Sequence, residues 1–186
     1  MSTSTRKRLF SRYIQDLPAG ELTWIGLRPE RKAEMLEVNS AQVFVGSGLE
    51  GDHGFENTLG AGRQVTLLSE EYIAQTQHFL SLSRSVNKGH QSDAIPSSIQ
   101  PKHLRRNLVI KGMNLDALRY QQFSIGSAIF EAGAICHPCL RMEELLGKGG
   151  IAAMMGHGGL CLKVIQSGTV TLGDTVCLHH PQQGLF

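Results

Sequence analysis

The chain has 186 residues, 41% of them hydrophobic, and 18 basic against 16 acidic side chains give it a formal charge of +2. This length predicts a single domain whose core is large enough to fold without disulfides. So mild a charge argues against binding to a nucleic-acid backbone, and no apolar run approaches the roughly 18 residues of a membrane span. We therefore expect neither nucleic acid nor membrane among the partners.

The amino-terminal residues lack the apolar segment of about 7–15 residues that a secretory signal requires. We therefore expect a cytoplasmic protein whose four cysteines stay reduced. We interpret residues 1–20 as an extension and residues 21–186 as one domain. Glycine is frequent, with 21 residues, whereas aromatic residues make up only 6%. This composition favours tight turns and a mainly β fold with a few helices, of the α+β class.

The first half of the chain is typical of strands separated by turns. A glycine-rich loop occupies residues 46–54. Ser69 stands at an N-cap position ahead of Glu70 and Glu71, which predicts a helix through about Leu80. The strands expected here are residues 22–27, 41–45 and 63–68.

The second half begins with a polar connection. Residues 81–100 carry few large apolar groups, and we interpret them as an exposed loop insertion. Pro101 begins a short helical turn. Pro138 suits the first turn of a helix that runs to Leu146, with Gly147 as its C-cap. The strands expected here are residues 107–110, 128–134, 160–165 and 169–178, the last broken by a Gly-Asp turn.

The strongest local feature is the sequence Cys136-His137-Pro138-Cys139, at the end of an expected strand and the start of the expected helix. Backbone N–H groups and the helix dipole at such a position stabilise a thiolate. A cysteine there is suited to be a nucleophile or a soft metal ligand.

Several interpretations of these cysteines stay open from the residues alone. Two cysteines spaced by two residues are typical of a thiol–disulfide centre, although the expected elements lack its βαβ context. Together with His157 and Cys161, Cys136 and Cys139 fit the ligand spacing of structural zinc. A single thiolate can instead hold a metal centre with an open position, such as a molybdenum cofactor. The simplest alternative is that the cysteines are small buried residues of the core.

A second group of polar residues, Arg105-Arg106-Asn107, stands at the entry to an expected strand. Arginine binds phosphate or carboxylate at two points, and an asparagine amide both donates and accepts, so the group suits a phosphorylated heterocyclic ligand. A solvated strand edge is the alternative. In the glycine-rich loop, Asp52 and His53 can act as acid, base or ligand, but an aspartate in such a turn also caps its own backbone.

A third group, Met154-Met155-Gly156-His157-Gly158-Gly159, directly precedes an expected strand. Its paired glycines let the backbone come close to a ligand or to another strand. His157 can donate a hydrogen bond or carry a charge, and a role on the surface or in the core is the alternative.

These motifs form an ordered series. It consists of residues 48–53, 63–70, 105–112, 125–131, 136–141 and 168–176. The series resembles the MOSC domain, the molybdenum cofactor sulfurase C-terminal domain family, over roughly residues 22–178. Several motifs in the right order are more specific than any one of them.

The resemblance implies a MOSC-type, β-barrel-like fold and binding of a molybdenum cofactor, or of reactive sulfur bound for it. By position, Cys139 looks like the thiolate ligand of molybdenum and the catalytic residue. Arg105 and Asn107 look like groups that hold the phosphate and pterin end of the cofactor. His137 and Pro138 look like residues that line the metal side.

Similar proteins reduce N-hydroxylated compounds, so we hypothesise a stand-alone member that does this, with a redox protein as electron donor. The alternative is a sulfur or cofactor carrier that uses a Cys139 persulfide without turnover of its own. We expect no pyridoxal phosphate, because 186 residues leave no room for the sulfurase domain that binds it. The sequence departs from the family pattern around His53 and at Met155, which leaves the roles of Asp52, His53 and His157 open.

Overall fold

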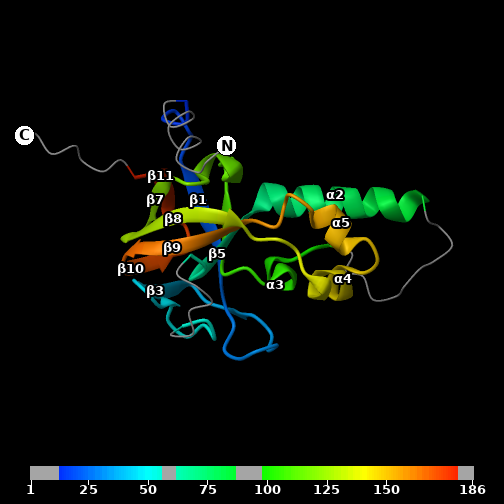
Figure 1. Ribbon diagram of the computed structural model, residues 1–186, viewed down its shortest axis with the longest axis horizontal. Coiled ribbons are helices and arrows are strands. Elements are labelled where there is room, and N and C mark those ends of the chain that lie inside the picture. The colour runs from blue at the N-terminus through cyan, green and yellow to red at the C-terminus, as the bar shows by residue number, and fades with distance from the viewer. Residues whose placement is uncertain (1–12, 56–61, 87–97, 180–186) are drawn as a thin grey trace, which may run out of the picture.

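Strands make up most of the regular structure and lie together at one side of the molecule, with most of the helices at the other (Figure 1). The computed structural model describes residues 13–55, 62–86 and 98–179. The strands are β1 (Gly20–Leu27), β2 (Leu36–Glu37), β3 (Ser40–Phe44), β4 (Gly48–Leu49), β5 (Val65–Ser69), β6 (Leu108–Lys111), β7 (Gln122–Ile125), β8 (Ala128–Ile135), β9 (Leu160–Gln166), β10 (Gly168–Thr171) and β11 (Thr175–Leu178). The helices are α2 (Glu70–Val86), α3 (Pro101–Leu104), the 3-10 helix η1 (Leu115–Leu118), α4 (Leu140–Leu146) and α5 (Gly150–Met154).

Among the described residues, seven strands close a barrel. They are hydrogen-bonded in the order β11, β7, β8, β9, β5, β6 and β1, and β1 pairs with β11 to complete the ring. β5 and β6 are parallel and lie on either side of α2 in the chain, so the fold does contain one βαβ crossover. β10, β3 and β4 form a smaller sheet. The mainly β, barrel-like fold expected from the sequence is confirmed.

Alternate side chains of the barrel strands fill its interior, because successive residues of a strand point to opposite faces. Leu67 of β5 and Leu108 and Ile110 of β6 are fully buried in this inner cluster. Phe123 and Phe130 stack there with their ring centroids 5.8 Å apart. Burying each such side chain contributes roughly 1.5–3 kcal/mol, so the inner cluster fixes the barrel.

A second buried cluster joins the outside of the barrel to the helices. Trp24, Leu68 and Val109 point outward from β1, β5 and β6 into this cluster. Helices α2, α3, α4 and α5 supply further side chains of this cluster, which are Leu80, Leu104, Met142, Leu146, Ala153 and Met154. β5 and β6 are therefore apolar on both faces, which is typical of strands covered on both sides.

Helix α2 is longer than the sequence predicts. It continues to Val86, so residues 81–86 are helical, and the prediction of an exposed loop is wrong there. Ile99, near the other end of that expected loop, is 7% exposed and packs in the outer cluster. Its backbone N–H donates to the Gln77 side chain of α2 at 2.8 Å. Residues 87–97 of the expected loop lie outside the described residues, as do residues 1–12 of the expected extension.

The sequence does not predict helix α5 or strand β7. Both are stabilised by tertiary contacts rather than marked by a local pattern. The carboxylate of Glu143 in α4 accepts hydrogen bonds from the N–H groups of Gly149 and Ile151 at 2.7 and 2.8 Å, which caps α5. β7 gains its hydrogen bonds from β8 and β11. Within the described ranges, no helix is both long enough and apolar enough to cross a membrane.

Candidate functional site

A network of charged and polar side chains lies where β1 ends and β6 begins. Arg28, directly after β1, donates from Nε and Nη2 to the two carboxylate oxygens of Asp52 at 3.0 and 2.6 Å. The N–H groups of Arg28 and Gly54 donate to the same carboxylate at 2.7 and 3.1 Å. Burial alone would raise the pKa of Asp52, but the Arg28 hydrogen bonds and charge, with Gly54, hold that pKa below its usual value. Asp52 is therefore an anionic clamp on Arg28, and His53 beside it is exposed.

Asn107 lies behind this clamp and is 1% exposed. Its Oδ1 accepts from the N–H and hydroxyl of Thr66 at 3.1 and 2.8 Å. Its Nδ2 donates to the Gly26 carbonyl at 3.2 Å and to Asp52 at 3.1 Å. Because both ends of the amide are used within the protein, Asn107 is placed to position Asp52 and, through it, Arg28.

Two further arginines hold the loop that follows Arg28. Arg105, in a left-handed conformation with φ of 53° that is uncommon outside glycine, donates to the Ala33 carbonyl at 2.5 Å. Arg141 donates to the Lys32 carbonyl at 3.0 Å. Burial, and then the positive charges of Arg141 and Arg28, lower the pKa of Arg105. Neither Arg105 nor Arg141 forms an ion pair with a described residue, whereas Arg28 is paired with Asp52.

Cys139 lies beside these arginines. It is an exposed free thiol at the N-cap of the seven-residue helix α4, and its charge would interact favourably with Arg105 and Arg106. His137 is exposed and Pro138 is half-buried. The fold thus brings the expected thiol and Arg105 into one region.

Arg106, unlike Arg105, is buried and used within the protein. It donates to the Gly158 carbonyl at 2.7 Å and to the Cys136 carbonyl at 3.4 Å. A β-carbon on Gly158 would lie 2.0 Å from the Cys136 carbonyl oxygen, and one on Gly159 would lie 2.1 Å from that of Leu67. The two glycines therefore allow close approach to neighbouring strands.

Cys136 and Cys161 form a buried pair, with 2% and 5% of their surface exposed. A hydrogen bond from the Cys161 thiol lowers the pKa of Cys136 to about 6, and the charges of Arg106 and Arg63 act in the same direction against burial. The Nη2 atom of Arg63 lies 3.9 Å from the Cys136 sulfur. The pKa of Cys161 is raised by the same hydrogen bond. Within this pair, ionisation is therefore favoured at Cys136 and disfavoured at Cys161.

The structural zinc interpretation is wrong. The described residues include its four ligands, yet nowhere do they bring together three or more His, Cys, Asp or Glu side chains that could hold a metal ion. His157 packs instead against aromatic rings, with centroids 5.1 Å from Tyr72 and 5.8 Å from Phe79. His157 therefore packs the segment before β9 against helix α2.

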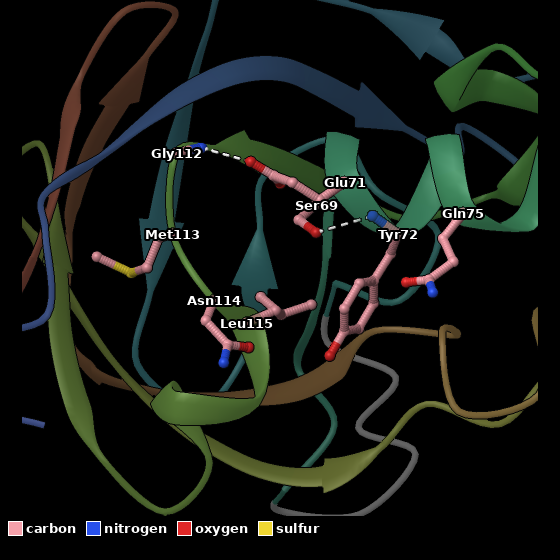
Figure 2. A pocket seen from close by; sticks show the side chains of 8 residues that line it. All are labelled: Ser69, Glu71, Tyr72, Gln75, Gly112, Met113, Asn114 and Leu115. Atoms are coloured by element: carbon pink, nitrogen blue, oxygen red, sulfur yellow. Dashed lines mark hydrogen bonds between the residues drawn. The ribbon is translucent and has the colours of Figure 1, made fainter.

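A cavity of about 330 Å³ lies near the start of α2, at the opposite ends of β5 and β6 from Thr66 and Asn107. Its lining residues are Ser69, Glu71, Tyr72, Gln75, Gly112, Met113, Asn114 and Leu115 (Figure 2). Two of its polar side chains are already used, because Glu71 accepts from the Gly112 N–H and Ser69 from the Tyr72 N–H. None of the site residues expected from the sequence lines this cavity.

Sequence reasoning missed three residues of the site. It gives no role to Arg28, it includes Arg141 only as the end of a motif, and it considers Cys161 only as a zinc ligand or a core residue. The one available signal was charge complementarity, because an arginine after one strand and an aspartate in a glycine-rich loop can pair when the loop folds back. Cys161 gave no signal, since only the β8–β9 pairing brings it to Cys136.

Comparisons with known proteins agree with this fold. No curated protein matches the chain. Among solved structures, the YUAD protein from Bacillus subtilis is similar, with a TM-score of 0.70 and 15% identity over 90% of this chain and 99% of that chain. YiiM from Geobacillus stearothermophilus has a TM-score of 0.62 and 12% identity over 89% and 77% of the two chains. YiiM from Escherichia coli has a TM-score of 0.59 and 18% identity over 87% and 70%. The MOSC domain family model matches residues 54–177, more than half of the chain, and the protein therefore belongs to the MOSC domain family.

Proposed function

We propose that this protein binds a molybdenum cofactor through the Cys139 thiolate and reduces N-hydroxylated small molecules with electrons from a redox partner protein. The observation that supports this most is the positive charge of Arg105 and Arg141, which no described carboxylate pairs with, in the same region as an exposed thiol. An anionic ligand seated there would offset the repulsion between the arginines.

The chemistry of the available groups fits such a cofactor. A thiolate is a soft ligand that suits this class of metal centre, and Cys139 is exposed. Arginine forks suit the phosphate of a pterin cofactor. The described residues offer no cluster of further His, Cys, Asp or Glu ligands, which agrees with a metal that brings its other ligands within the cofactor.

The roles of the chain's own residues follow from their contacts. Arg105 and Arg141 would bind the anionic end of the cofactor, since neither is neutralised by a described carboxylate. Arg28 retains 25% side-chain exposure, so part of this side chain stays accessible while Asp52 holds its guanidinium. Asn107 orients that pair, and His137 and Pro138 line the metal side.

The bound cofactor would supply a two-electron redox change and accept an oxygen atom. Reduction of R–NH–OH to R–NH2 breaks the N–O bond, consumes two electrons and two protons, and releases water. The redox partner supplies the electrons. His137, an exposed imidazole two residues from Cys139, can hand on a proton from solvent.

The test is turnover by protein made in a host that synthesises the cofactor. Reduction of N-hydroxylaminopurine to adenine, with reduced methyl viologen as electron donor, should be abolished in Cys139→Ala. Arg105→Met should lower kcat/KM by about tenfold, the effect of losing about 1.4 kcal/mol of binding. Cys177→Ala removes another exposed thiol, on β11, and is the matched control that should keep full activity. Undiminished turnover in Cys139→Ala would overturn the proposal.

The same exposed thiol favours one alternative, a carrier of sulfur or of the cofactor that forms a Cys139 persulfide. This alternative predicts sulfane sulfur on Cys139 after incubation with a persulfide donor, together with no reduction of N-hydroxylaminopurine. Failure to label Cys139 under those conditions would exclude it.

A further inference from the structure

Cys136 and Cys161 lie on the same face of the barrel although 24 residues separate them in the sequence. Ile135 of β8 pairs with Leu160 of β9, and the Cys136 N–H donates to the Gly159 carbonyl at 2.8 Å. Cys136 is therefore opposite Gly159. Cys161 follows Gly159 by two residues, within β9. In an antiparallel ladder such positions are diagonal neighbours on one face, and the Cys161 thiol is near enough to lower the pKa of Cys136 through a hydrogen bond.

The surroundings of the pair differ from those of core cysteines. Arg63 lies 3.9 Å from the Cys136 sulfur through Nη2, and Arg106 is fixed close by through its bond to the Cys136 carbonyl. A cysteine that only filled space would be expected among apolar side chains. Cationic neighbours lower the pKa of a thiol, and a second thiol nearby with a raised pKa is typical of a nucleophilic and a resolving cysteine.

We propose that Cys136 and Cys161 form a dithiol site that reacts with small hydroperoxides and closes to a reversible disulfide. The Cys136 sulfur attacks the O–O bond and takes one oxygen as a sulfenic acid, and the other oxygen leaves as an alcohol or water. The Cys161 sulfur then attacks the Cys136 sulfur, an S–S bond forms, and the hydroxyl leaves as water. In total the two thiols lose two electrons, and ROOH is reduced to ROH and water.

The burial of the pair selects its oxidant. With 2% of Cys136 exposed, only a small molecule such as hydrogen peroxide can reach the sulfur. Closing the disulfide removes the negative charge between Arg63 and Arg106, so oxidation makes this region more positive. The proposal does not depend on molybdenum binding at Cys139.

The experiment treats the full-length protein with hydrogen peroxide, blocks the remaining thiols with N-ethylmaleimide and maps tryptic peptides by mass spectrometry without reduction. The expected product is a cross-link between the peptides that carry Cys136 and Cys161, with loss of two free thiols, reversed by dithiothreitol. The Cys136 peptide also contains Cys139, since no Lys or Arg stands between Arg119 and Arg141. The experiment is therefore repeated on Cys139→Ser, which should form the same cross-link.

Two further variants make the outcome decisive. Cys161→Ala should stop at the sulfenic acid, which dimedone labels on Cys136, whereas Cys177→Ala should behave like the wild type. Exposed Cys177 is the internal reference for peroxide dose. A cross-link from Cys136 to Cys139 would overturn the proposal, and so would an intact Cys136 thiol at a dose that oxidises Cys177. Both results can be read from the wild-type protein even if Cys161→Ala fails to fold.

Discussion

At the scale of single residues, ionisation of the buried Cys136 thiol is favoured because its neighbours replace the stabilisation that water would give. The Cys161 thiol donates a hydrogen bond to its sulfur, and Arg106 and Arg63 supply positive charge. Burial opposes ionisation but does not outweigh these contacts, so the pKa falls from 9.0 to about 6.

Thiolate absorbance at 240 nm should therefore rise through a step centred near pH 6 in the wild type. Cys136→Ser should remove that step, and Cys161→Ala should move it to higher pH by removing the hydrogen-bond donor. Because the pKa is lower in the folded protein, the ionised thiol stabilises the fold fully above about pH 9, and this contribution is lost as the pH falls through about 6. If the step near pH 6 persists in Cys136→Ser, it belongs to another group and the assignment to Cys136 is wrong.

At the scale of elements, the Arg28–Asp52 clamp fastens the chain after β1 to the glycine-rich loop after β4. Asp52 has 3% side-chain exposure and accepts hydrogen bonds from Arg28, Gly54 and Asn107. Asp52→Ala would leave these donors without a partner, and we expect it to lower the free energy of unfolding by about 3 kcal/mol.

Urea denaturation compares this variant with Glu21→Ala. Glu21 pairs with Lys111 at 3.2 Å, but both side chains are 47% exposed, so its loss should cost less than about 1 kcal/mol. Equal losses in the two variants would show that the clamp adds no more than a surface ion pair does.

Most of the barrel strands could be predicted because their alternation or apolar character is local. The end of α2 could not, since its last residues are polar and its length depends on contacts of Leu80 and Ile99 with the outer cluster. The site was predicted only in part. Cys139 and Arg105 stand in motifs. Arg28 is brought in by its ion pair with Asp52 and Cys161 by the β8–β9 pairing, and no local pattern indicates either contact.

At the scale of the whole molecule, the two buried clusters stabilise different parts of the fold. The inner cluster closes the barrel, and the outer cluster fixes α2, α3, α4 and α5 against it. Arg105 directly follows α3, and Cys139 directly precedes α4. The barrel and these helices thus set the spacing between Arg105 and the exposed thiol, and under the proposed function this spacing would preorganise the region for an anionic ligand.

Molybdenum content per chain tests the central claim most directly. The wild type, Cys139→Ala and Cys177→Ala would be purified from a host that makes the cofactor, and their metal measured by mass spectrometry, with circular dichroism to verify the fold. If Cys139 is the ligand, the wild type and Cys177→Ala should hold close to one molybdenum per chain, and folded Cys139→Ala should hold at least about tenfold less. The same molybdenum content in Cys139→Ala as in the wild type would contradict ligation by Cys139.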